Sequence, residues 1–186
     1  MSIRISGGRL KGRLIGSPQA AKGVRPTTER VKLAIFSIIG DNSVHDTNVL
    51  DLYSCTGALG IEAVSRGASF VDMVEKNFKN YKLINDNVKK LKIQNSVKVY
   101  KSTVKDFLNL TDRRYGLIFV DPPFDLNEWE KVLLNIDERK ILLKEGVLIA
   151  EHPNSVCLEN NYGDLKMQDQ RKYGDSIISF FGVCNG

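Results

Sequence analysis

Short apolar runs alternate with amphipathic stretches along most of this chain. Five runs are rich in β-branched and aromatic residues, as buried parallel strands are: 48–53, 70–75, 97–100, 115–120 and 146–150. Four stretches between them have helical periodicity: 58–66, 77–92, 103–109 and 127–135. The clearest of these places five apolar residues on one helical face: Phe78, Tyr81, Ile84, Val88 and Leu91. Alternating strands and helices predict an α/β fold with a Rossmann-like, mostly parallel sheet.

The two ends of the chain depart from this alternation. Residues 165–173 and 176–183 are two β-like runs joined at Gly174-Asp175, which predicts a C-terminal antiparallel hairpin. At the other end, "IRISGGRLKGRLIG" predicts a second hairpin around Gly7-Gly8, and "RPTTERVKLAIFSIIG" predicts a helix that Gly40 ends. We therefore expect a hairpin and helix extension over residues 1–40 and one larger domain over residues 41–186.

The positive charge of the chain is concentrated in that extension. The whole chain has 27 Lys and Arg against 22 Asp and Glu, a net charge of +5. Residues 1–32 hold eight of the basic residues and a single acid, Glu29, so the remainder is slightly acidic. A basic arm suits a polyanion such as nucleic acid, although a solvated basic face is an equally good explanation from charge alone.

Composition argues against several other classes of protein. No stretch approaches the roughly 20 apolar residues of a membrane helix, and no signal-peptide core follows the N-terminus, so we expect a cytoplasmic protein without membrane contact. Cys55, Cys157 and Cys184 are widely spaced, as are the two histidines, and neither set has the spacing of metal ligands. We expect free thiols and no metal.

The loop after the first core strand has the features of a nucleotide-cofactor site. "VLDLYSCTGALG" (49–60) places small residues where a backbone can approach a ligand at the carboxyl end of a strand. Asp51 suits an amino group and argues against a pyrophosphate, and Glu75 ends the next strand, where a carboxylate can bind both hydroxyls of a ribose. An adenosine ligand with a positive amino-acid group and no diphosphate matches S-adenosylmethionine better than NAD.

The fourth core strand ends in Asp121-Pro122-Pro123-Phe124, the D-P-P-F turn. Two prolines cannot continue a strand, so the chain turns outward at the ligand edge of the sheet. Asp121 and the Pro122 carbonyl can accept both N–H bonds of an exocyclic amine, and Phe124 can stack on the attached base. An aromatic amine is a weak nucleophile, and these acceptors would direct its lone pair at a sulfonium methyl and stabilise the developing positive charge.

These motifs together resemble a known family. "LDLYSCTGALGIEAVSRGA", "VEKN" and "FVDPPF" resemble class I S-adenosylmethionine-dependent methyltransferases that act on exocyclic amines of bases. "RISGGRLKGRLI", "RPTTERVKLAIFSII" and "KYGDSIISFF" are similar to the RsmD family, which methylates N2 of one guanine in bacterial 16S rRNA. The similarity covers nearly the whole chain, and the basic arm joined to R-P-T-T-E-R-V is its more specific part.

The resemblance implies a role for particular residues. The catalytic group falls on Asp121, Pro122, Pro123 and Phe124. The cofactor-binding group falls on Asp51, Tyr53, Ser54, Cys55, Thr56, Gly57, Glu75, Thr103 and Asp121. The RNA-contacting group is in the arm: Arg4, Arg9, Lys11, Arg13, Arg25 and Arg30. The implied partner is 16S rRNA or the assembling small ribosomal subunit, bound by a monomer.

Two positions depart from the family pattern. The family usually has Phe-Ala-Gly-Ser-Gly where this chain has Tyr53-Ser54-Cys55-Thr56-Gly57, and Thr103 stands where an acid or amide commonly meets the adenine amino group. We expect Thr103 to weaken cofactor binding without abolishing it. We interpret Cys55 as a structural substitution at a negative φ, because methyl transfer to an amine has no step that needs a thiol.

Three alternatives stay open from the sequence. An NAD-type oxidoreductase is disfavoured by Asp51 and by the D-P-P-F turn, which has no role in hydride transfer. A non-catalytic RNA-binding protein would have no use for an amine clamp. An amino-methyltransferase acting on adenine N6 or cytosine N4 is compatible with the turn, and only the flanking resemblance favours guanine.

Overall fold

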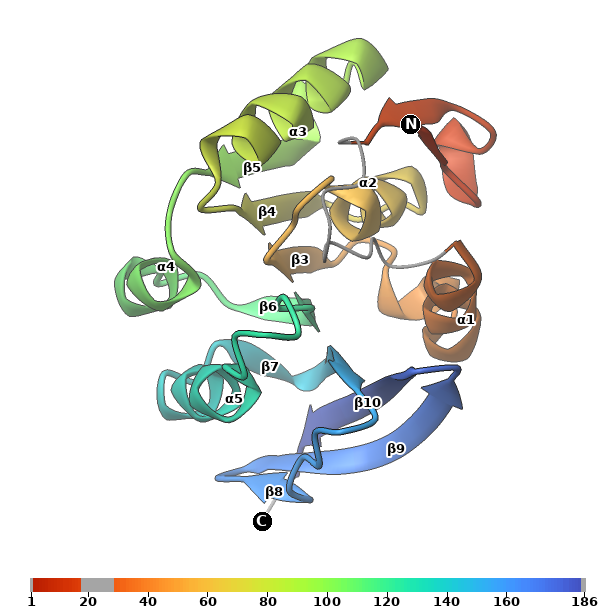
Figure 1. Cartoon of the computed structure of the whole chain (residues 1–186). Helices are drawn as coiled ribbons and strands as arrows, with labels where there is room; N and C mark the ends of the chain where they lie inside the picture. Colours follow the sequence, from red (N-terminus) through yellow and green to blue (C-terminus); the bar gives the residue numbers. More distant parts are fainter. Residues whose placement is uncertain (1, 18–28, 185–186) are drawn as a thin grey trace.

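A central eight-stranded sheet organises the chain in the computed structural model, which describes residues 2–17 and 29–184 (Figure 1). Its strand order is β5-β4-β3-β6-β7-β10-β9-β8. The five parallel strands are β3 (Asn48–Leu52), β4 (Phe70–Val74), β5 (Val97–Tyr100), β6 (Tyr115–Val120) and β7 (Leu142–Pro153). The three antiparallel strands at one edge are β8 (Asn161–Tyr162), β9 (Leu165–Tyr173) and β10 (Ser176–Val183).

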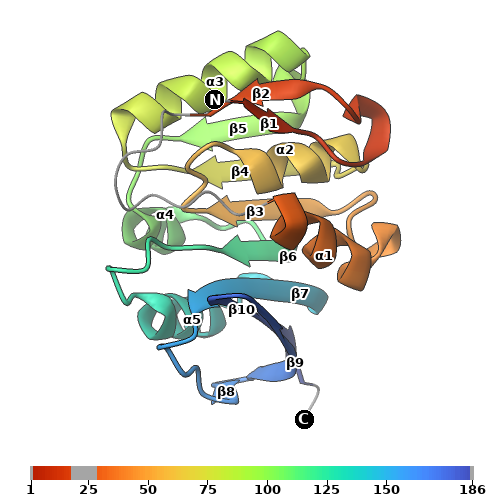
Figure 2. The same cartoon turned by 45° about the vertical axis from the view of Figure 1, so that its right-hand side comes forward.

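Helices cover both faces of the sheet (Figures 1 and 2). The helices packed on one face are α1 (Glu29–Ile39), α2 (Ala58–Ser65) and α3 (Phe78–Leu91), and those on the other are α4 (Val104–Leu110) and α5 (Trp129–Glu138). Strand β3 shows why both faces are covered. Val49 packs in the core formed with α1, α2 and α3, whereas Leu50 and Leu52 pack in the core formed with α4 and α5. A strand that is apolar on both faces needs a helix on each.

The N-terminal segment packs onto the same core. Strands β1 (Ser2–Arg4) and β2 (Leu14–Gly16) form an antiparallel hairpin, joined through the 3₁₀ turn η1 (Gly8–Leu10). Ile5, Leu10 and Ile15 belong to the core cluster that includes Val49 and Val71 of the sheet. The described part of residues 1–40 therefore has no separate hydrophobic core, and a division at residue 40 stays a prediction.

A buried ionic cluster fastens this segment to α2. Glu62, which is fully buried, accepts hydrogen bonds from the Ser6 N–H (2.9 Å) and hydroxyl (2.8 Å). Lys32 of α1 reaches the same carboxylate at 2.8 Å and Arg66 reaches it at 3.1 Å. Burial opposes ionisation of Glu62, but these donors outweigh it and lower its pKa. Lys32 is thus part of the interior and not of the basic surface that its charge predicted.

The fold predicted from sequence is confirmed, with local differences. The C-terminal hairpin spans the predicted residues, whereas β7 extends well beyond the predicted 146–150 run. On α1, the apolar residue Ile38 is exposed, whereas Lys32 and Phe36 are buried. On α3, Phe78 is half exposed although its spacing predicted burial. No helix in residues 2–17 and 29–184 is both long and apolar enough to cross a membrane.

Candidate active site

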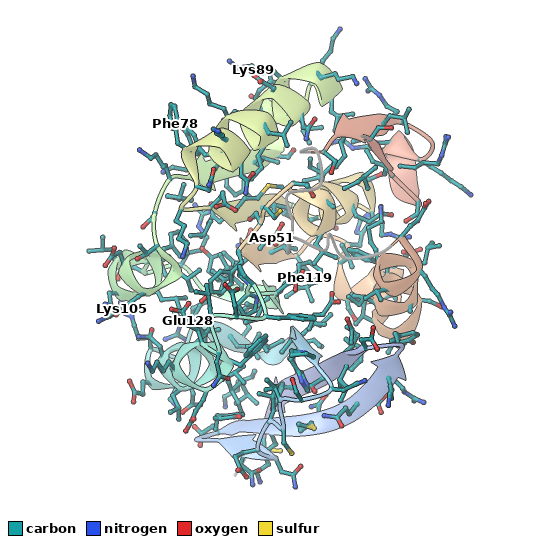
Figure 3. All side chains as sticks on the ribbon, in the orientation of Figure 1. Asp51, Phe78, Lys89, Lys105, Phe119 and Glu128 are labelled. Atoms are coloured by element: carbon teal, nitrogen blue, oxygen red, sulfur yellow. The ribbon has the colours of Figure 1, made fainter. Side chains whose placement is uncertain are left out.

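A cavity of about 290 Å³ opens at the carboxyl ends of the parallel strands, where the strand order reverses between β3 and β6. Ligands bind at this switch point in open α/β sheets. Most of the lining comes from the segments that follow β3, β4, β5 and β6. The residues that line it are Asp51, Tyr53, Ser54, Cys55, Thr56, Ala58, Leu59, Val74, Glu75, Lys76, Asn77, Asn80, Ser102, Val104 and Asp121 to Phe124. Figure 3 shows Asp51 beside α2, near the centre of the molecule.

The loop after β3 is tightly wound. Tyr53, Cys55 and Gly57 all have a left-handed backbone, with φ of 60°, 51° and 75°. The Ser54 N–H donates to the Val74 carbonyl (3.0 Å), and the Gly57 N–H donates to the Ser54 carbonyl (2.7 Å). These bonds hold the loop against β4 and direct its turn into α2. Gly57 begins that helix and does not line the cavity, so its role is in the turn.

Asp51 is the most deeply buried carboxylate of the site, with 2% of its surface exposed. Its Oδ2 accepts the Gly60 N–H at 3.0 Å. Burial raises the pKa of Asp51 to about 7, and the charge of Glu75 adds to the rise against the Gly60 and Ser54 hydrogen bonds. A carboxyl in this state gains most from a cationic ligand, which would stabilise its ionised form.

Glu75 is held by two backbone donors. Its Oε2 accepts the Cys55 N–H (2.9 Å) and its Oε1 accepts the Asn77 N–H (2.6 Å). Each carboxylate oxygen keeps a second lone-pair direction for a ligand hydroxyl. The two bonds fix the carboxylate plane at the end of β4, as ribose binding requires.

Our expectation of a negative φ at Cys55 is wrong. Its φ is 51°, the left-handed region that favours glycine, because the loop must reverse while the Cys55 N–H reaches Glu75. Burial and the charges of Glu75, Asp121 and Asp51 raise the pKa of the Cys55 thiol to about 12. The thiol is therefore protonated at neutral pH, which agrees with a structural residue and argues against a nucleophile.

The D-P-P-F turn forms another wall of the cavity. Phe124 is 38% exposed and its ring lies 6.3 Å from that of Trp129, at 50° between planes. The ring is thus supported from one side and is not inserted into the core. The Pro123 carbonyl accepts the Leu126 N–H at 3.0 Å, whereas no donor in the described parts of the chain bonds to the Pro122 carbonyl.

Thr103 lies outside the cavity lining, contrary to expectation. It is the N-cap of α4, where its hydroxyl accepts the Asp106 N–H (3.1 Å) and donates to the Asp106 carboxylate (2.7 Å). Ser102, one residue earlier, lines the cavity instead. The T-x-x-D spacing of an N-cap, Thr103 to Asp106, is the sequence signal that could have shown this.

Among the arm residues that the structure describes, no basic side chain lines the cavity. Arg4, Arg9, Lys11 and Arg13 are exposed on the hairpin, whose turn packs on the C-terminal end of α2 through the Leu10 N–H and Ser65 (2.9 Å). Figure 2 shows this turn on the side away from the arrowheads of β3, β4 and β6. Arg30 is exposed at the start of α1, and Arg25 lies outside the described residues.

Other site residues had no strong sequence signal. Glu128 accepts a hydrogen bond from the Tyr53 hydroxyl at 2.7 Å and so links the cavity loop to the start of α5. Lys76, Asn77 and Asn80 line the cavity from the beginning of α3. The described residues contain no cluster of His, Cys, Asp and Glu that could hold a metal ion.

Comparison with known proteins places the chain among methyltransferases. The family model described as "Conserved hypothetical protein 95" matches residues 3–182. "Putative rRNA methyltransferase YlbH" of Bacillus subtilis is 34% identical over 96% of this chain and 98% of its own length. "Ribosomal RNA small subunit methyltransferase D" of Escherichia coli is 32% identical, over 80% of this chain and 74% of its own.

Solved structures agree on the fold. "Putative methyltransferase yhhF" from Escherichia coli superposes with a TM-score of 0.88 at 24% identity, with both chains fully covered. SMU.776, a methyltransferase complexed with SAH, has a TM-score of 0.70 at 16% identity over 87% of this chain and half of its own. These likenesses show the fold, and the family model with the curated relatives shows the class, that of rRNA methyltransferases. Within it, the chain belongs to the RsmD family, as its motifs predicted.

Proposed function

We propose that this protein transfers a methyl group from S-adenosylmethionine to the exocyclic N2 of a guanine in small-subunit rRNA. The observation that carries the proposal is that Asp51, Glu75 and the D-P-P-F turn open into one cavity. Family membership supports an rRNA substrate, since relatives bear the name of rRNA small-subunit methyltransferases. We further propose that the protein acts as a monomer in the cytoplasm.

The cavity residues fit S-adenosylmethionine. The partly buried loop offers a carboxyl with a raised pKa, Asp51, to the amino group of the amino-acid end. Glu75, fixed by two backbone N–H groups, suits the ribose hydroxyls. In place of Thr103, Ser102 would be the side chain next to the adenine. When bound, the cofactor would supply an electrophilic methyl group on a positive sulfonium.

The D-P-P-F turn would then orient the accepting amine. Asp121 and the Pro122 carbonyl accept its two N–H bonds, so that the nitrogen lone pair points into the cavity. Phe124, supported by Trp129, stacks on the base. Asp121 also stabilises the positive charge that develops on the nitrogen as the new C–N bond forms.

The test is transfer of labelled methyl from S-adenosylmethionine to small-subunit particles from a strain that lacks this modification. The expected product is N2-methylguanosine, and Asp121→Ala should lower the rate at least a hundredfold. A labelled N6-methyladenosine or N4-methylcytidine would reject guanine as the target. Cofactor binding without transfer to any rRNA would reject the rRNA substrate.

A further inference from the structure

An exposed aromatic ring among lysines lies beside the cavity, next to β4 and β5. We call it the rim patch and define it by Phe78, by Lys82 and Lys101 over its ring, and by its chain neighbours Lys76 and Lys79. Figure 3 shows Phe78 on the side to which the arrowheads of β3 and β4 point in Figure 1. This is the edge of the sheet at which the cavity opens.

The ring of Phe78 is presented to solvent by its neighbours. It occupies the first position of α3 and is 50% exposed. The Tyr81 ring lies 6.4 Å away and nearly parallel, at 16°. The ammonium groups of Lys82 and Lys101 lie 4.7 Å and 5.0 Å from the Phe78 ring centre. A single exposed apolar residue is ordinary on a protein surface, but two cations directed at one ring make a mixed aromatic and cationic surface.

The positive charge of the patch is not neutralised locally. All four lysines are exposed, and none forms an ion pair with an acid in residues 2–17 and 29–184. Of the exposed acids on α3 and α4, Asp106 is bonded to Thr103, and Asp86 lies two turns along α3 from Phe78. A local excess of one sign favours a polyanion.

The patch is continuous with the cavity. Lys76, Asn77 and Asn80, which flank Phe78 in the chain, line the cavity, and so does Ser102, which follows Lys101. The turn of the N-terminal hairpin lies at the opposite ends of the strands, where it packs on the C-terminal end of α2. A nucleotide inserted at the D-P-P-F turn would therefore have its neighbours nearer to the rim patch than to the turn of the basic hairpin.

We propose that the rim patch binds a single-stranded RNA segment next to the target nucleotide. This rests on the proposed function, in that the substrate is RNA. Phe78 stacks on one base, and the lysines contact phosphates on either side of it. Stacking on an aromatic ring together with a positive groove is how proteins bind single-stranded nucleic acid without reading its sequence.

Titration of RNA affinity against salt tests this proposal. The probe is a labelled, unmodified small-subunit rRNA transcript, and S-adenosylmethionine affinity is measured in parallel. Lys82→Gln/Lys101→Gln should lower the slope of log K against log salt by roughly 1.4, because each lost phosphate contact on a single strand contributes about 0.7. Phe78→Ala should weaken binding roughly tenfold without changing that slope, and Phe78→Trp should restore it.

The matched control is Lys166→Gln/Lys172→Gln, which removes the same charge from β9 at the far edge of the sheet. If the two double variants have equal salt slopes and Phe78→Ala binds like the wild type, the rim patch is rejected. Methyl transfer by the wild-type protein to the same transcript is scored separately. If the wild type transfers methyl and every variant binds RNA like the wild type, only the rim patch is rejected. If the patch variants bind RNA more weakly but the wild type transfers no methyl, the proposed reaction is rejected and the RNA-binding surface stands.

Discussion

At the scale of single residues, the site contains a buried carboxyl group, that of Asp51, whose pKa is raised. Asp51 is almost fully buried and its pKa is raised to about 7. The folded, ligand-free protein holds the Asp51 proton more tightly than the unfolded chain does. The contribution of protonated Asp51 to the free energy of unfolding is therefore fully present below pH about 4. It is lost as the pH rises through about 7. The residue is retained at a cost in stability that a cationic ligand would offset.

Asp51→Asn should therefore stabilise the ligand-free protein at pH 8 and have little effect at pH 4. A shift of about three pKa units corresponds to an upper limit of about 4 kcal/mol. Urea unfolding at the two pH values measures the difference. The same variant should bind S-adenosylmethionine more weakly at pH 7, since the amide carries no charge. Equal free energies of unfolding for variant and wild type at pH 8 would contradict the claim that ionised, buried Asp51 destabilises the ligand-free protein.

Cys55 is a second residue whose substitution has a defined expectation. Cys55→Gly removes the side chain from a left-handed position, which relieves strain of about 1 kcal/mol but increases the entropy of the unfolded chain by a similar amount. The free energy of unfolding should change by less than about 1 kcal/mol, and methyl transfer should stay within tenfold of the wild type. Cys55→Ala isolates the thiol itself. A loss of activity beyond tenfold in both variants would mean that the thiol takes part.

At the scale of elements, the cavity loop and the D-P-P-F turn are joined across the site. The Tyr53 hydroxyl donates to Glu128 at 2.7 Å, and Glu128 immediately precedes α5, whose first residue, Trp129, supports Phe124. Tyr53 also has a left-handed backbone, so its side chain is directed by the loop that binds Glu75. Under the proposed function, this link would set the distance between the part of the cavity that binds the cofactor and the part that binds the amine.

Tyr53→Phe should lower kcat for methyl transfer roughly tenfold, because a small displacement of the reacting groups is costly in rate. Affinity for S-adenosylmethionine should change by no more than about threefold, since the ring and its packing are kept. Tyr162→Phe, which loses a hydroxyl remote from the cavity, is the control. A tenfold loss of cofactor affinity with unchanged kcat would place Tyr53 in binding and not in positioning.

The elements themselves were largely predictable from the sequence, whereas their local geometry was not. Apolar runs with β-branched residues identified β3 to β6, because strands buried on both faces need such runs. The left-handed backbone at Cys55 was not predictable, since it depends on Glu75, which is distant in the chain. Burial of Lys32 escaped prediction for the same reason, because its partner Glu62 comes from another helix. Thr103 was expected near the adenine, but its hydroxyl caps α4 through Asp106.

At the scale of the whole molecule, the N-terminal segment and the sheet are parts of one structure. Lys32 and Glu62 form a buried ion pair at 2.8 Å, and Lys32 also donates to the Arg4 carbonyl at 2.7 Å. Each group neutralises the charge of the other, which would otherwise be buried without a counter-ion. The pair therefore specifies how the hairpin and α1 dock on α2.

Lys32→Met should lower the free energy of unfolding by about 3 kcal/mol, as expected when one partner of a buried pair is removed. Chemical unfolding at neutral pH measures this loss. Lys166→Met, at an exposed position, should change stability by less than about 0.5 kcal/mol. The double variant Lys32→Met/Glu62→Gln should recover part of the stability, and a full additive loss would show that the two groups are not coupled.

The docking of the hairpin has a consequence during synthesis. Gly16 exchanges hydrogen bonds with Asn87, 71 positions later in the chain, and the surfaces that cover Ile5, Leu10 and Ile15 are made of helices and strands translated after them. At roughly 5 to 20 residues per second, the first strands wait on the order of 4 to 14 seconds for that partner. The nascent hairpin segment is thus an unpaired, basic and partly apolar stretch that is translated before its partners and completed late, at which stage it is open to chaperones and proteases.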